Sequence, residues 1–272
     1  MSQKHTTRYN NRGASYSARP QYPPELITGA IQKSGLQSGD TVVDIGAGSG
    51  RLTKALLELG FTVRAVEPSD MRLEAKKNLE SYPDFQIYEG EAVKPNIPEH
   101  TYGKIKAIFA GQSLHWWRHQ FKEAVREWNK FLHPTGKLIA LTQHFNDSSE
   151  VCQHIDTTLS RICPGYDDQI VKLLYKNSPG FSNYEYRRYL DFENRHLDVA
   201  KFDFTTDEQG FRNLLTSFSF TPNPETQRED LNQLLDTMVR EVFQKHAQGG
   251  EITIPYVSKI WHGTLITPDL IR

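Results

Sequence analysis

Residues 40–70 read DTVVDIGAGSGRLTKALLELGFTVRAVEPSD, and this stretch decides the fold. It contains a short β-branched run, a turn with three glycines, a helix with leucines at helical spacing and a second apolar strand. Gly46, Gly48 and Gly50 allow the backbone to turn sharply and to approach a ligand without a Cβ in the way. Glu67 ends the second strand about 20 residues after Gly46, where a carboxylate can accept hydrogen bonds from ribose hydroxyls. The stretch therefore predicts half of a nucleotide pocket at the carboxyl ends of parallel strands.

Strands and helices alternate on both sides of this stretch, through residue 142. Such alternation is typical of a parallel sheet with helices on both faces, so we expect residues 1–142 to form an N-terminal arm and an α/β core. The other elements expected in this part are a helix from Pro24 or Glu25, strands over 85–88, 105–110 and 137–142, and a helix over 121–132.

The regular alternation ends after residue 142. Residues 143–235 are rich in aromatic and charged side chains, which favours a cap inserted over the active edge of the sheet, and residues 236–272 should return to the core. The elements expected here are helices over 151–162, 207–215 and 230–247, short β-like stretches over 184–189 and 201–204, and a final strand within 251–266.

Bulk properties narrow the class of protein. The chain has 272 residues, 32 Lys and Arg against 33 Asp and Glu, and a net charge of -1, so the overall charge favours neither nucleic acid nor an anionic membrane as a partner. Its two cysteines are too few for a disulfide framework and lack metal-ligand spacing. No segment has the apolar length of a membrane span, and the first residues lack a signal-peptide core, so we expect a cytoplasmic protein. The oligomeric state stays open.

Several motifs together resemble the class I S-adenosyl-L-methionine-dependent methyltransferases. Those that carry this resemblance are Val42–Gly50 (VVDIGAGSG), Glu67, Gly90-Glu91-Ala92 and Leu132–Gly136 (LHPTG). A narrower resemblance, to the trans-aconitate methyltransferase-like small-molecule branch with a methyltransferase type 11 domain, rests on Tyr16–Pro23, Ser113–Trp116 and Thr216–Phe218. The resemblance implies a doubly wound, mostly parallel seven-stranded Rossmann-like sheet with a cap insertion, and S-adenosylmethionine as the cofactor.

A nicotinamide- or flavin-dependent enzyme is the main alternative, because a glycine-rich turn and a downstream acid serve both cofactor classes. The dinucleotide fingerprint G-x-G-x-x-G/A would need a small residue at position 51, where this chain has Arg51. Asp44 also stands two residues before Gly46, where a carboxylate can organise the loop and face, through water, a positively charged amino group. These features favour the methyltransferase over an NAD(P)-dependent Rossmann oxidoreductase. A cofactor-binding protein without transfer activity also stays open.

The resemblance implies a set of cofactor-binding residues. The glycines would embrace the methionine part, Glu67 would hold the ribose hydroxyls, Met71 would pack on adenine, and Gln112 would meet the amino acid part through its backbone. The whole set is Asp44, Gly46, Ala47, Gly48, Gly50, Glu67, Pro68, Met71, Glu91, Ala92 and Gln112.

The methyl acceptor is expected to be a small metabolite enclosed by the cap, methylated on oxygen or nitrogen, with a carboxylate among the options. The residues expected near it are Tyr16, Arg19, His115, Trp116 and Ser217. His115 is the candidate general base, because an unperturbed histidine titrates near neutral pH; a packing role is the alternative. In-line transfer from a sulfonium requires no metal, so none is expected.

Overall fold

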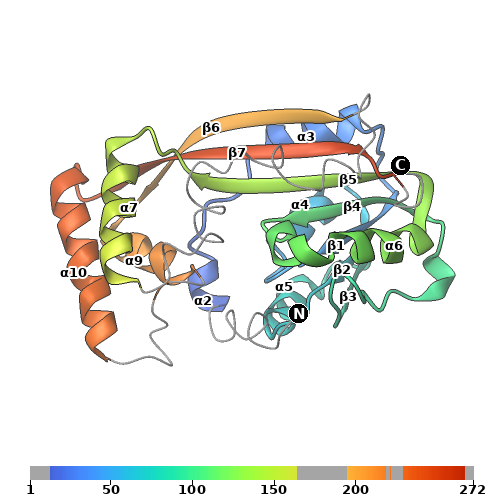
Figure 1. Cartoon of the computed structure of the whole chain (residues 1–272), viewed down its shortest axis with the longest axis horizontal. Coiled ribbons are helices and arrows are strands. Elements are labelled where there is room, and N and C mark those ends of the chain that lie inside the picture. Colours follow the sequence, from blue (N-terminus) through green and yellow to red (C-terminus); the bar gives the residue numbers. More distant parts are fainter. Residues whose placement is uncertain (1–12, 164–194, 219–220, 222–228, 267–272) are drawn as a thin grey trace.

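The computed structural model describes residues 13–163, 195–218, 221 and 229–266. Seven strands form one sheet in the order β3-β2-β1-β4-β5-β7-β6 (Figure 1). The pairs from β3 to β5 are parallel, whereas β7 runs antiparallel to both β5 and β6. The strands are β1 Thr41–Ile45, β2 Thr62–Val66, β3 Phe85–Tyr88, β4 Ile105–Gly111, β5 Leu132–Phe145, β6 His196–Thr206 and β7 Ile252–Thr264.

Helices cover both faces of the sheet because successive side chains of a central strand point to opposite faces. Val42 packs in the apolar cluster that includes α3 and α4, whereas Val43 packs in the cluster that includes α6. Phe109 and Ile108 on β4 divide between the same two clusters. The helices of this part are α2 Gly13–Tyr16, α3 Pro24–Lys33, α4 Arg51–Glu58, α5 Met71–Leu79 and α6 Phe121–Phe131, with 3-10 turns η2 Glu99–Thr101 and η3 Leu114–Gln120.

A second group of helices packs on the far ends of the long strands β5, β6 and β7. Figure 1 shows α7 (Glu150–Ile162), α9 (Glu208–Thr216) and α10 (Glu229–His246) at the left, away from β1–β3. Their apolar faces form a separate buried cluster with strand residues such as Phe145 and Ile254. The helices of the described residues include none with the length and apolarity needed to traverse a bilayer.

The predicted doubly wound sheet with helices on both faces is confirmed. Two details differ. β5 begins at Leu132, which pairs with Ile105, and its ladder with β4 then shifts so that Ala107 pairs with Lys137; the four intervening residues bulge out. The expected β-like stretch over 201–204 is part of the eleven-residue edge strand β6.

The expected division of the chain at residues 142 and 235 stays a proposal. β5 continues past this first boundary to Phe145, and β6 lies within 143–235 but pairs along its whole length with β7. The helices α7 and α9 of the same segment do pack away from the parallel strands. The β-like stretch expected over 184–189 lies outside the described residues.

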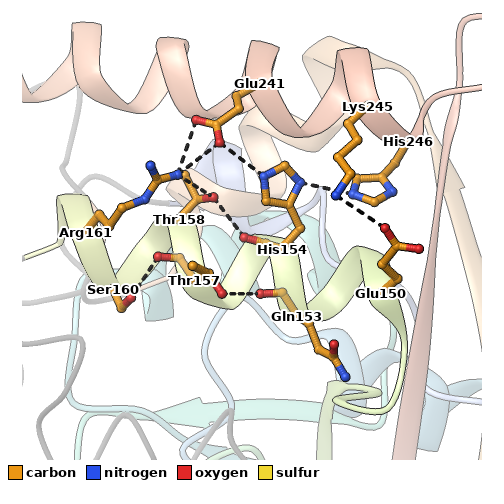
Figure 2. Close-up of polar contacts among 10 residues, drawn as sticks. All are labelled: Glu150, Gln153, His154, Thr157, Thr158, Ser160, Arg161, Glu241, Lys245 and His246. Atoms are coloured by element: carbon orange, nitrogen blue, oxygen red, sulfur yellow. Dashed lines mark hydrogen bonds and ion pairs between the residues drawn. The ribbon is translucent and has the colours of Figure 1, made fainter.

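Charged side chains join α7 to α10 (Figure 2). The two ring nitrogens of His154 lie 3.1 Å from Glu241 Oε1 and 3.0 Å from His246 Nε2. Arg161 Nη2 also donates to Glu241, at 3.0 Å. Hydrogen bonds from His154 and Arg161 lower the pKa of Glu241, and burial lowers the pKa of His246. Both shifts disfavour protonation in the folded state.

Removing the Glu241 charge is therefore expected to weaken the contacts between α7 and α10 only at pH values at which Glu241 is ionised. A carboxyl with a lowered folded-state pKa contributes stability above its unfolded-state pKa and loses it as the pH falls through the folded-state value. Glu241→Gln should lower the free energy of unfolding at pH 7 by less than about 1 kcal/mol, because the pairs are partly exposed. Urea unfolding from pH 3 to 8 measures it, and the difference from wild type should shrink as the pH falls below the unfolded-state pKa of about 4.3 and vanish only below the lowered folded-state pKa. Glu150→Gln, which removes the more exposed pair with Lys245, is the matched control; an equal loss there would contradict the assignment.

Candidate cofactor and acceptor site

The glycine turn follows β1 and is hydrogen-bonded to the carboxyl end of β2. Ile45 and Val66 end these strands in register, and the N–H groups of Gly46 and Ala47 both donate to the Val66 carbonyl, at 2.8 and 3.1 Å. Gly46 has φ +72°, and a Cβ there would lie 2.6 Å from the Ser113 Cβ. Only glycine fits this conformation and this spacing. The conformation of Gly46 therefore fixes the direction in which the chain continues from the end of β1 into the turn.

The carboxylate of Glu67 ties the turn to the end of β2. Its Oε2 accepts from the Gly48 N–H at 2.9 Å, and its Oε1 accepts from the Ser69 N–H at 2.9 Å and the Ser69 hydroxyl at 2.5 Å. Burial raises the pKa of Glu67, and the hydrogen bonds oppose that rise. Pro68 follows, and Met71 Cε lies 3.3 Å from where a Cβ of Gly48 would be. Gly48, Glu67 and Met71 therefore lie side by side at the carboxyl ends of β1 and β2.

Asp44 lies beneath the turn and is 1% exposed. Its Oδ2 accepts from the Thr53 hydroxyl at 2.6 Å, whereas its Oδ1 is shielded from solvent and has no hydrogen-bond donor among the described residues. Burial raises the pKa of Asp44 to about 7. A buried carboxylate oxygen without a donor costs free energy, so a ligand that brings a donor or a positive charge is stabilised beside it.

The other predicted cofactor residues lie at the ends of β3 and β4. The backbone of Glu91 pairs with that of Lys94, and the carbonyl of the buried Ala92 accepts from Trp128 Nε1 at 2.9 Å. Gln112, directly after β4, has a left-handed φ of +54° and donates its N–H to the Leu141 carbonyl at 2.9 Å. These residues share the carboxyl edge of the sheet with the glycine turn.

The N-terminal arm contacts the end of α9 through Arg19. Arg19 Nε donates to the Ser217 hydroxyl at 2.9 Å, and Nη2 donates to the Ser217 carbonyl at 2.7 Å. Its guanidinium also lies 4.2 Å from the ring centre of Tyr16 and 5.1 Å from that of Phe218. Three of the five residues predicted near the acceptor are thereby brought together: Tyr16, Arg19 and Ser217.

A pocket lies where the arm, the strand ends and α9 meet. About 330 Å³ of space that no atom fills lies within it, and this space includes open solvent. The arm contributes four of its lining residues, and the rest come from the glycine-turn helix, from β4, β5 and β7, and from the segment after α9. The lining residues are Tyr16, Arg19, Pro20, Tyr22, Arg51, Gln112, Gln143, Phe218 and Tyr256.

His115 and Trp116 lie nearby in η3 but are not among these lining residues. Their rings stack at a tilt, with centres 4.6 Å apart. Trp117 is 5% exposed and packs in the apolar cluster under α6. η3 therefore places one tryptophan in the core and leaves the His115–Trp116 pair at the strand-four edge.

The sequence analysis predicted three of the nine lining residues, Tyr16, Arg19 and Gln112, and missed the other six: Pro20, Tyr22, Arg51, Gln143, Phe218 and Tyr256. Arg51 directly follows the glycine turn, so its place at the carboxyl edge of the sheet could have been predicted from the sequence. Gln143 follows the predicted fifth strand and could have been found by the same rule. Tyr256 belongs to the antiparallel strand β7 and reaches the pocket only because that strand inserts beside β5; no local signal identifies it.

A model of the methyltransferase domain family matches residues 43–140. An uncharacterized methyltransferase of Schizosaccharomyces pombe is 23% identical over 246 residues, which are 89% of this chain and 92% of that protein. An uncharacterized methyltransferase of Oceanobacillus iheyensis is 36% identical over 130 residues, 47% of this chain and 56% of that protein. Matches to several bacterial relatives thus span only about half of their length.

Solved structures show the same fold. A proposed type II methyltransferase from Anaeromyxobacter dehalogenans superposes with a TM-score of 0.62 at 18% identity, covering 91% of this chain and 98% of that one. The YcgJ protein from Bacillus subtilis gives a TM-score of 0.50 at 14% identity, covering 89% and 98%. The fold likeness therefore extends well beyond residues 43–140.

Proposed function

Since the chain is a class I S-adenosylmethionine-dependent methyltransferase by family match, relatives and fold, we propose that it methylates an oxygen or nitrogen of a small molecule held in the pocket behind the N-terminal arm. The family assigns S-adenosylmethionine rather than NAD(P) as cofactor. The comparisons do not single out the trans-aconitate-like branch, which stays a prediction.

Two observations support the fit of the predicted residues to this cofactor. The buried Asp44 Oδ1 has no donor among the described residues, and a positively charged amino group would supply one. Gly48 has φ +58° and leaves open the space that a Cβ would fill over Met71. We propose that the cofactor residues expected from the sequence hold it, with Glu67 facing the ribose and Met71, Glu91 and Ala92 around the adenine.

The single observation that carries the proposed acceptor is the contact between the arm and α9. The Arg19–Ser217 hydrogen bonds join segments 198 positions apart and close a pocket beside Gln112. Its lining residues come from the arm, the strand ends and the segment after α9, and a concave site at the carboxyl ends of the strands is where α/β folds bind small molecules.

S-adenosylmethionine supplies a methyl group on a positively charged sulfur, which leaves as a neutral thioether. The chain's own contribution would be to align the acceptor and to exclude water. Tyr16 and Phe218 offer aromatic walls for that purpose, and Arg19 holds the arm against α9.

Transfer of a labelled methyl group to a library of small metabolites tests the function. We expect label in at least one small acceptor and calorimetric binding of S-adenosylmethionine without comparable binding of NAD. Cofactor binding with no transfer to any member of a broad library would favour the cofactor-binding protein instead.

His115, which lies in η3 outside the pocket lining, is proposed as the general base for an acceptor that extends from the pocket to η3 and must lose a proton. His115→Gln, which keeps the polarity but cannot take up a proton at neutral pH, should lower kcat about 100-fold or more and remove the lower limb of its pH profile. A pH-independent loss of activity, together with a lower melting temperature, would assign His115 to packing against Trp116.

A further inference from the structure

The pocket is rich in positive charge. Two arginines, Arg19 and Arg51, line it together with three tyrosines. No Asp or Glu side chain of the described residues belongs to its lining. A concave site that is lined by two guanidinium groups and, among the described residues, by no carboxylate attracts an anion.

Arg51 has hydrogen-bonding capacity left over. Its Nη2 donates to the Pro20 carbonyl, and its guanidinium lies 5.8 Å from the ring centre of Tyr22. Its Nε is shielded from solvent and has no acceptor among the described residues. Leaving a buried donor of a charged group unpaired is costly, and an oxyanion entering the pocket would relieve that cost.

No Asp or Glu is among the charges of the described residues that act most strongly on Arg51. Burial lowers the pKa of Arg51, and the groups whose charges act on it are Tyr22, Tyr16, Arg19 and Tyr256. Among these, burial raises the pKa of Tyr22, so its phenol carries no negative charge near pH 7 that could pair with Arg51. Arg19 adds a second positive charge while its Nε and Nη2 hydrogens are engaged by Ser217.

We propose that the methyl acceptor bears an oxyanion, a carboxylate or a phosphate, and that Arg51 is the residue that recognises it. This inference rests on the proposed function. A planar guanidinium donates two parallel N–H groups to the two-oxygen edge that both anions share. The aromatic rings of Tyr16 and Phe218 would contact the remainder of the acceptor.

Calorimetry on the full chain saturated with S-adenosylhomocysteine tests the inference with benzoate, phenyl phosphate and neutral benzamide. Benzamide has the ring and nearly the shape of benzoate without its charge. At least one of the anions should bind about tenfold or more tightly than benzamide. Arg51→Gln should abolish that preference, Arg51→Lys should keep part of it, and Arg161→Gln, which removes the same charge on α7, should leave it unchanged.

Three results would overturn the inference. In the first, benzamide binds as tightly as the anions, and in the second the preference for the anions survives Arg51→Gln. In the third, Arg51→Gln loses as much affinity for S-adenosylhomocysteine as for the anion, which would assign the guanidinium to the carboxylate of the cofactor. The wild-type preference needs no variant, so it stays decisive if Arg51→Gln unfolds. Failure of the proposed function looks different, since S-adenosylhomocysteine would then not bind to the wild-type chain at all.

Discussion

Asp44→Asn should stabilise the cofactor-free protein at pH 8 and at the same time weaken S-adenosylmethionine binding about 100-fold. The carboxyl of Asp44 is buried, and burial raises its pKa to about 7. An acid whose folded-state pKa lies above its unfolded-state value makes the protein less stable as the pH rises between the two, and the whole penalty applies above the higher one. Asparagine avoids that penalty and can still accept the Thr53 hydrogen bond, but it leaves a buried N–H unpaired, so we expect a net gain of about 1–3 kcal/mol.

The same titration predicts how the wild type behaves with pH. Its affinity for S-adenosylmethionine should rise between pH 6 and 8 as Asp44 ionises, whereas the affinity of Asp44→Asn should stay flat over that range. Calorimetry and urea unfolding at each pH measure both effects. Asp70→Asn, the same change at an exposed position near the site, is the control and should alter neither. A destabilised Asp44→Asn at pH 8 would contradict the raised pKa.

Gly48→Ala should reduce cofactor affinity by about 30-fold or more with only a small loss of stability. The left-handed φ of +58° costs an alanine roughly 1 kcal/mol. The added methyl group would meet the flexible end of Met71 at 3.3 Å and the edge of the Tyr16 ring at 4.0 Å, so the fold should survive. It would project over the loop where the cofactor is proposed to lie.

Gly103→Ala is the matched control for this substitution. Gly103 has φ +74°, and a Cβ there meets nothing within 4 Å. Both variants should lose roughly 1 kcal/mol in urea unfolding because they share the backbone strain. Only Gly48→Ala should lose binding in calorimetry. Equal affinities in the two variants would remove Gly48 from the cofactor surface.

Local patterns predicted most of the fold. The glycine turn, the helix ending at Gly60 and the alternating strands up to residue 142 each follow from a few neighbouring residues, and the parallel sheet follows from their alternation. The edge strand β6 was found only in part. Its side chains alternate between half-buried and exposed, so its sequence lacks the continuous apolar run of a central strand.

The candidate site was also predictable only where its residues belong to a local motif. Asp44, Gly48 and Glu67 belong to one motif, so the sequence predicted that they lie close together, although it did not predict the hydrogen bonds that Thr53 donates to Asp44 and Gly48 to Glu67. Tyr256 and Gln143 enter the pocket from β7 and β5, and their approach depends on an antiparallel pairing between strands more than 100 residues apart. Of these distant segments, only Thr216–Phe218 was linked to the site by the sequence, through the narrower resemblance.

The insertion of β7 between β5 and β6 has a consequence for biosynthesis. β7 follows every other described strand in the chain, yet it fills the space between two of them. While the ribosome is still making this strand, β5 presents an open edge, and β6 has no described partner strand. Such edges invite pairing with other chains. We therefore expect nascent chains that end before residue 252 to need chaperone protection. We also expect the last step of folding to be the insertion of β7 between β5 and β6, which completes the sheet.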